Sequence, residues 1–66
     1  MITIGTLATN INVGDFILLP NGYTEEVAKV HHQENIVCLE FVRKGGAIKS
    51  RWWLMIDEVA SVVESW

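Results

Sequence analysis

The residues best suited to binding chemistry lie in one short segment of the chain. Four of the five lysine and arginine residues fall within nine positions, and two tryptophans follow at once. Arginine side chains can bind phosphates or carboxylates in a bidentate manner, and an exposed indole offers a stacking platform for a base or a cation. The sequence therefore predicts a binding surface, and its candidate contact residues are Arg43, Lys44, Lys49, Arg51 and Trp53.

A purely structural interpretation of the same segment is also open. Lysine and arginine would then keep a hairpin tip soluble, while one tryptophan fills the core and the other covers its edge. The basic strand could also pair with carboxylates on neighbouring strands, for which the candidates are Glu25, Glu26 and Glu40. The net charge is −3, which favours an acidic protein partner or a small anionic ligand over a long nucleic acid, because phosphate binding rests mainly on positive charge.

Metal binding and catalysis have weak support. His31 and His32 are adjacent, so in a strand they point to opposite faces and cannot share a metal with Cys38. No second cysteine completes a tetrahedral set, and a lone cysteine in an apolar strand is typical of inert core. Carboxylates at expected turns, which local backbone hydrogen bonds explain, are Asp15, Asp57 and Glu58. We therefore expect no metal, no cofactor and no enzyme activity.

Length and composition limit the class of protein. Sixty-six residues make one domain, and a chain of this size buries only about 60% of the surface that its unfolded form exposes. Half of the residues are hydrophobic and three are tryptophan, which is more apolar surface than so small a monomer can hide. We therefore expect a homo-oligomer.

The single cysteine, Cys38, excludes a disulfide within the chain. Residues 1–9 lack the basic, long apolar pattern of a leader, so the sequence favours a reducing, cytoplasmic setting. No run approaches the roughly 20 apolar residues that a membrane span requires, and we expect no membrane association.

Short runs rich in β-branched and aromatic residues alternate with glycine, proline and asparagine turn signals. Pro20-Asn21-Gly22 is a favourable turn because proline presets φ and glycine accepts a positive φ, and Gly45-Gly46 is expected to close a hairpin. Such spacing is typical of small all-β barrels and sandwiches. The predicted strands, of which the first is an edge, are Ile2–Leu7, Asp15–Leu19, Thr24–His32, Ile36–Arg43 and Ile48–Met55.

Alternation along these strands divides the side chains between two faces. In the fourth strand the buried residues are expected to be Val37, Leu39 and Phe41, with Cys38 on the other side and Glu40 marking the wet face. In the third strand one face is expected to hold Val27, Lys29 and His31, and the other Ala28 and Val30. In the fifth strand the residues expected to face the core are Ile48, Trp52 and Leu54, and those expected to face outward are Lys49, Arg51 and Trp53.

The C-terminal segment is open to two interpretations. Val59, Val62, Val63 and Trp66 sit at helical spacing, and Asp57 could cap a helix. Val62 and Val63 are poor helix formers, however, and about ten residues make a weak helix. We prefer a one-turn 3-10 element at Ile56–Val59 followed by a closing strand at Ala60–Ser65, with the terminal Trp66 docked against the domain or a partner subunit.

Two parts of the chain resemble small SH3-like barrels. The first is Ile11–Leu18 with Asn21–Val27, where an apolar-Gly-Asp-apolar step and a polar hairpin precede a strand. The second is Leu54–Val63, which is similar to their short turn and closing strand. The resemblance implies a five-stranded, partly open barrel, and it implies no particular activity.

Together these features favour a small non-catalytic protein-interaction module that acts as a homo-oligomer. We expect such a module to be a stand-alone phage or microbial regulator or inhibitor, of the kind that compact genomes encode. The alternative is a nucleic-acid or nucleotide-binding barrel that uses the segment from Arg43 to Trp53 for stacking and phosphate contact.

Overall fold

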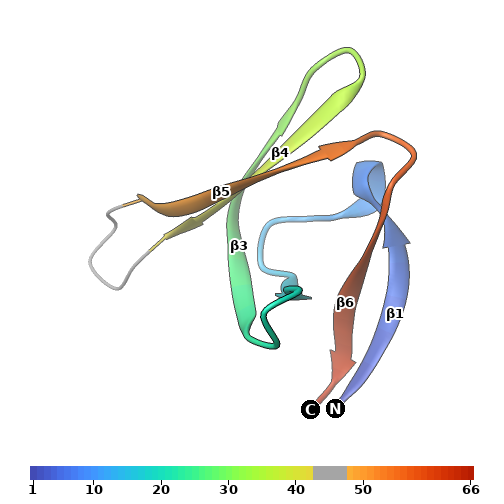
Figure 1. Ribbon diagram of the computed structural model, residues 1–66, viewed down its shortest axis with the longest axis vertical. Coiled ribbons are helices and arrows are strands. Elements are labelled where there is room, and N and C mark those ends of the chain that lie inside the picture. The colour runs from blue at the N-terminus through green and yellow to red at the C-terminus, as the bar shows by residue number, and fades with distance from the viewer. Residues whose placement is uncertain (43–47) are drawn as a thin grey trace.

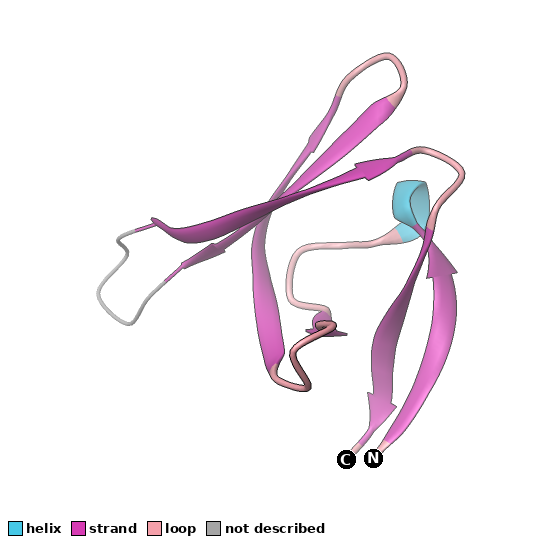
Figure 2. Ribbon diagram, in the orientation of Figure 1, coloured by secondary structure: helices cyan, strands magenta, loops and turns pink. Residues whose placement is uncertain are grey.

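The computed structural model describes residues 1–42 and 48–66, and that part of the chain is all-β apart from one short 3-10 turn (Figures 1 and 2). The elements are β1 (Ile2–Leu7), η1 (Ala8–Asn10), β2 (Phe16–Leu18), β3 (Thr24–His32), β4 (Ile36–Val42), β5 (Ile48–Met55) and β6 (Val59–Ser65). The predicted bounds of β1, β3 and β5 are confirmed. Arg43, Lys44 and the Gly45-Gly46 turn lie outside the described residues.

The strands form one antiparallel sheet with the order β1-β6-β2-β3-β4-β5. β6 lies between β1 and β2, which brings the two ends of the chain side by side (Figure 1). β1 and β5 are the two edges of the sheet, and they do not pair with each other. The all-β prediction is confirmed, but the sheet has six strands instead of five and is open, not a closed barrel.

The C-terminal segment is a strand, as preferred, but the 3-10 turn lies elsewhere. Met55 and Glu58 form a tight turn in which the Glu58 amide donates to the Met55 carbonyl at 3.0 Å and the Met55 amide donates to Glu58 Oε1 at 3.0 Å. This turn leads directly into β6. The 3-10 turn instead follows β1, where the Ile11 amide donates to the carbonyl of buried Ala8 at 3.3 Å.

The core lies between the two halves of the bent sheet. Its buried residues are Ala8, Ile11, Ile17, Val27, Val37, Leu39, Phe41, Leu54 and Ala60. Trp52 is partly buried and packs against this cluster, so the predicted inward positions of β4 and β5 are confirmed for every residue whose side chain is described; the Ile48 side chain is outside that part. Trp66 makes an edge-to-face contact with Phe16, with ring centroids 5.2 Å apart.

A β-bulge in β3 overturns the predicted faces of that strand. Val27 pairs with Phe41, whereas Lys29 pairs with Glu40, so Ala28 is an extra residue between the two pairs. An extra residue reverses the alternation that follows it. Val27 therefore lies in the core, while Lys29 and His31 lie on the opposite face of the sheet; the prediction that these three residues share a face is wrong.

Two turns depend on glycine. Gly14 and Gly22 have φ values of 96° and 89°, a region that favours glycine because it lacks a Cβ. At the first turn the Asn12 amide donates to Asp15 Oδ2 at 2.8 Å, and at the second the Tyr23 amide donates to Asn21 Oδ1 at 3.0 Å. Asp15 thus has the local structural role that its position predicts. No helix in residues 1–42 or 48–66 is long and apolar enough to cross a membrane.

Candidate functional site

One face of the β3–β4–β5 part of the sheet gathers most of the chemically interesting side chains. The register places Lys29, Glu40 and Arg51 in one cross-strand row and His31, Cys38 and Trp53 in the next. Ile36 and Met55 form a third row. We call this surface the outer face, and its residues are Lys29, His31, Ile36, Cys38, Glu40, Arg51, Trp53 and Met55.

Glu40 is the centre of the outer face and is buried, with an exposed fraction of 6%. His31 Nε2 contacts Glu40 Oε2, and Arg51 Nε lies 3.9 Å from Glu40 Oε1. Glu40 therefore lies on the side of β4 opposite the core, as predicted, but its own carboxylate is buried instead of exposed. Longer side chains on the two neighbouring strands flank the carboxylate and shield it from water, and they supply the charge or hydrogen bond that a buried carboxylate requires.

The ion pair between Arg51 and Glu40 is one of the contacts that the structural interpretation of the basic segment predicts. Both His31 and Arg51 keep 49% of their side-chain surface exposed. The Arg51 guanidinium has five N–H donors, and its Nε is the atom nearest to Glu40. Arg51 therefore lies within ion-pair distance of Glu40 while half of its side chain remains accessible to a ligand.

Cys38 is 2% exposed and lies between His31 and Trp53 in the cross-strand row. Burial raises the pKa of the Cys38 thiol, the nearby Glu40 carboxylate raises it further, and Arg51 opposes the shift. A thiol with a raised pKa is neutral at physiological pH, and neutral thiols are poor nucleophiles. The geometry thus agrees with a structural role for this cysteine.

We expect Cys38 to be slow to react with a maleimide in the folded protein and fast in the unfolded one. Because its pKa is higher in the folded state, thiol ionisation should favour unfolding at alkaline pH: stability is kept below the unfolded pKa and is lost as the pH rises above it. Labelling followed by mass spectrometry, with and without urea, checks this. Equal labelling rates in the two states would contradict the prediction.

Trp53 and Met55 are the large apolar side chains that the outer face leaves accessible, with exposed fractions of 54% and 47%. Cross-strand neighbours hold Trp53 beside Cys38 and Met55 beside Ile36. Their positions follow from the alternation of β5, which turns Trp52 and Leu54 toward the core. The predicted division of the two adjacent tryptophans, one inward and one outward, is confirmed.

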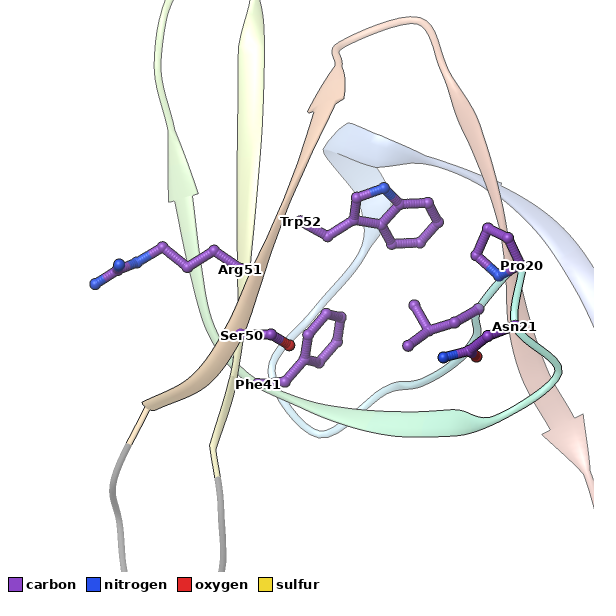
Figure 3. A pocket seen from close by; sticks show the side chains of 7 residues that line it. Pro20, Asn21, Phe41, Ser50, Arg51 and Trp52 are labelled. Carbon is purple, nitrogen blue, oxygen red and sulfur yellow. The ribbon is translucent and has the colours of Figure 1, made fainter.

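The opposite face of the sheet carries a hollow of about 300 Å³ between β5 and the β2–β3 turn (Figure 3). Its lining residues are Leu19, Pro20, Asn21, Phe41, Ser50, Arg51 and Trp52. The rings of Trp52 and Phe41 point toward Pro20 across the hollow, whereas the Arg51 side chain points away from it. The volume is at the lower end of the range for small-molecule sites.

The predicted binding residues are thus placed only in part. Arg51 and Trp53 lie on the outer face in adjacent rows. Lys49 belongs to β5, although its side chain lies outside the described part, as do Arg43 and Lys44 entirely. The sequence pattern missed His31 and Lys29 as members of this surface because the bulge at Ala28 reverses their face.

The described residues offer no group of three or more histidine, cysteine or carboxylate side chains that could hold a metal ion. His31 lies on the outer face with its ring against Glu40, and His32 pairs with Val37 in a row that faces the other way. The outer face can therefore bind a partner through cations, an indole and a thioether. No protein-family model, curated protein or solved structure matches this chain.

Proposed function

We propose that this chain is a small non-catalytic protein-interaction module that acts as a homo-oligomer. The observation that carries the proposal is the outer face, where half-exposed Trp53 and Met55 lie beside half-exposed Arg51 and His31. Aromatic residues, methionine and arginine are enriched in protein–protein interfaces, and tryptophan and arginine carry a large share of binding energy at such sites. The module needs no cofactor or metal for this role.

The partner that fits this surface best is an acidic protein with some apolar surface. Lys29, His31 and Arg51 supply positive or titratable groups, and the one carboxylate among them, Glu40, is buried. A partner carboxylate can bind the free N–H groups of Arg51 while Trp53 covers an adjacent apolar side chain. We assign this activity to a stand-alone regulator or inhibitor in the cytoplasm of a microbe or of a cell infected by a phage.

We also propose an SH3-like relationship for β2 to β6. Strands β2, β3, β4 and β5 are neighbours in the sheet in the same order as in the chain. The fifth strand, β6, then returns to lie beside β2. A sheet whose last strand lies beside its first supports the five-stranded, partly open barrel that the sequence resembles. In this description β1 is an addition at the edge, paired only with β6.

Replacing Trp53 by alanine is expected to weaken binding of an acidic peptide about tenfold, a loss of roughly 1.4 kcal/mol. The probe is a glutamate-rich peptide containing leucine, and binding is followed by tryptophan fluorescence and calorimetry at low salt. Tyr23→Ala is the matched control, because Tyr23 is a highly exposed aromatic residue in the β2–β3 turn and is not part of the outer face. Arg51→Gln should weaken binding in the same direction as Trp53→Ala.

Equal affinities for wild type, Trp53→Ala and Arg51→Gln would contradict the role of the outer face. A single-stranded oligonucleotide is titrated in parallel at two salt concentrations. Tryptophan quenching by the oligonucleotide that weakens with salt, with no response to the peptide, would favour the nucleic-acid or nucleotide-binding alternative. The net charge of −3 disfavours that outcome, because a long nucleic acid would also meet the acidic remainder of the surface.

A further inference from the structure

We propose that β1 pairs with β1 of a second copy of this chain, in antiparallel orientation about a two-fold axis at Gly5. This inference names the surface for the homo-oligomer of the proposed function and rests on that part of it. It concerns the opposite end of the sheet from the outer face, since β1 and β5 are the two edges.

β1 lacks the features that protect edge strands from pairing. Natural edges are usually blocked by charged side chains, proline or bulges that turn the edge away. The sequence has no charged side chain and no proline before Asp15. The β1–β6 pairing has one irregularity, at Ile2, where the extra residue Glu64 belongs to β6, and it is regular from Thr3 to Leu7. The β5 edge, in contrast, carries Lys49 and Arg51. β1 is therefore the edge available for strand addition.

The hydrogen-bonding direction along β1 can be derived from one contact. The Ala8 amide donates to the Glu58 carbonyl at 2.9 Å, on the β6 side. Because this direction alternates in an antiparallel pair, Ile4 and Thr6 also bond to β6. The N–H and C=O groups of Thr3, Gly5 and Leu7 then point to the open edge.

Only one register of two antiparallel β1 strands pairs all three outward-facing residues. It places Gly5 opposite Gly5 of the second copy and Thr3 opposite Leu7, which gives about six backbone hydrogen bonds across the axis. Shifting the register by two residues leaves about four. A glycine at the axis also removes any side-chain collision where the two strands are related by symmetry.

Apolar side chains near this edge support a second copy as the occupant. Ile2, Ile4 and Leu7 of β1 are exposed, by 60%, 49% and 44%, and Val59 of β6, opposite Leu7, is exposed by 62%. Self-pairing brings these apolar side chains close to those of the second copy, and it brings no like charges together. It also uses both β1 edges and closes the assembly as a two-fold dimer.

A six-residue ladder is a small interface, so we expect a dimer with a dissociation constant in the range of about 1 to 50 μM. Analytical ultracentrifugation of wild type from 1 to 200 μM measures it. Leu7→Pro is the test variant: Leu7 has φ −59°, which proline accepts, and the lost N–H faces the open edge. Leu7→Ala is the matched control, because it trims the side chain and keeps that N–H.

Leu7→Pro should weaken the dimer at least tenfold and stay folded by near-UV circular dichroism, while Leu7→Ala should weaken it less than Leu7→Pro. Ile4→Lys provides a second variant, since it adds charge to the edge without touching the backbone. The register is tested with Ile4→Cys and Thr6→Cys, each in a Cys38→Ala background. In the proposed register residues 4 and 6 face each other across the axis, so mixing the two single variants with oxidised glutathione should give mainly the mixed disulfide.

The outcomes separate this inference from the proposed function. A wild-type protein that is monomeric at 200 μM would overturn both the homo-oligomer and the β1 interface. A dimer unaffected by Leu7→Pro and Ile4→Lys would overturn the β1 interface and leave the homo-oligomer standing. Peptide binding by the outer face is expected to be unchanged in monomeric Leu7→Pro, because the two surfaces lie at different edges of the sheet.

Discussion

Replacing Phe41 by alanine is expected to lower the free energy of unfolding by about 3 to 5 kcal/mol. Phe41 is 1% exposed and is the largest fully buried side chain of the described core. Its backbone pairs with Val27 on β3 and Ser50 on β5, and its ring lies at the floor of the hollow beside Trp52. A domain of this length has a total stability of roughly 3 to 10 kcal/mol, so the variant should be largely unfolded at 37 °C.

The matched control is Phe16→Ala, which removes the same atoms from a partly buried position on β2. Phe16 packs edge-to-face against Trp66, and we expect a loss of only about 1 to 2 kcal/mol because aromatic pairs of this kind contribute modestly. Urea unfolding followed by tryptophan fluorescence measures both variants. A Phe41→Ala protein as stable as Phe16→Ala would show that the core is organised around other residues.

Much of the fold follows from local signals in the sequence. The first and last residues of β1, β3 and β5 match the runs of β-branched and aromatic residues in the sequence. The Pro20-Asn21-Gly22 turn forms with Gly22 at positive φ. The alternation of Val37, Leu39 and Phe41 correctly marks the buried side of β4. These signals act over a few residues, so the sequence displays them directly.

The predictions of strand faces and burial are wrong where contacts with residues distant in the sequence determine the structure. The bulge at Ala28 depends on how Val27 must bond to Gly14 and Asp15 on one side while Lys29 pairs with Glu40 of β4 on the other, and nothing in the local sequence marks it. Burial of Glu40 likewise depends on His31 and Arg51 from the two neighbouring strands. A carboxylate in a strand is normally exposed, and only the register shows that this one is shielded.

The candidate site was predictable to the extent that it depends on β5 alone. Alternation separates Trp53 from Trp52, and it places Arg51 with Trp53. The hollow was not predictable, because Pro20 and Trp52 are distant in sequence and approach each other only when the sheet bends. The position of β1 at an edge of the sheet was predicted correctly, but its pairing with β6 was not, because that pairing joins the two ends of the chain.

Replacing Arg51 by glutamate is expected to lower the free energy of unfolding by about 2 to 3 kcal/mol, whereas Arg51→Gln should cost about 1 kcal/mol or less. Arg51 and Glu40 are direct cross-strand neighbours, and like charges in that position are destabilising. Glu40 is almost fully buried, so its carboxylate cannot turn to water to relieve the repulsion. Arg51→Gln removes the attraction without adding repulsion, and it is therefore the better variant for binding experiments.

The double variant Arg51→Glu with Glu40→Gln separates electrostatics from packing. If repulsion between the two carboxylates is the cause, Glu40→Gln should restore about 1 to 2 kcal/mol to Arg51→Glu while costing stability in the wild-type background, a coupling that a double-mutant cycle measures. Urea unfolding of the four proteins gives the value. If Glu40→Gln restored no stability to Arg51→Glu, the coupling energy between residues 40 and 51 would be negligible, and repulsion between their carboxylates would not be the cause. Rescue of folding without recovery of peptide binding would show that Arg51 is needed for the partner itself, since the fold no longer depends on its charge.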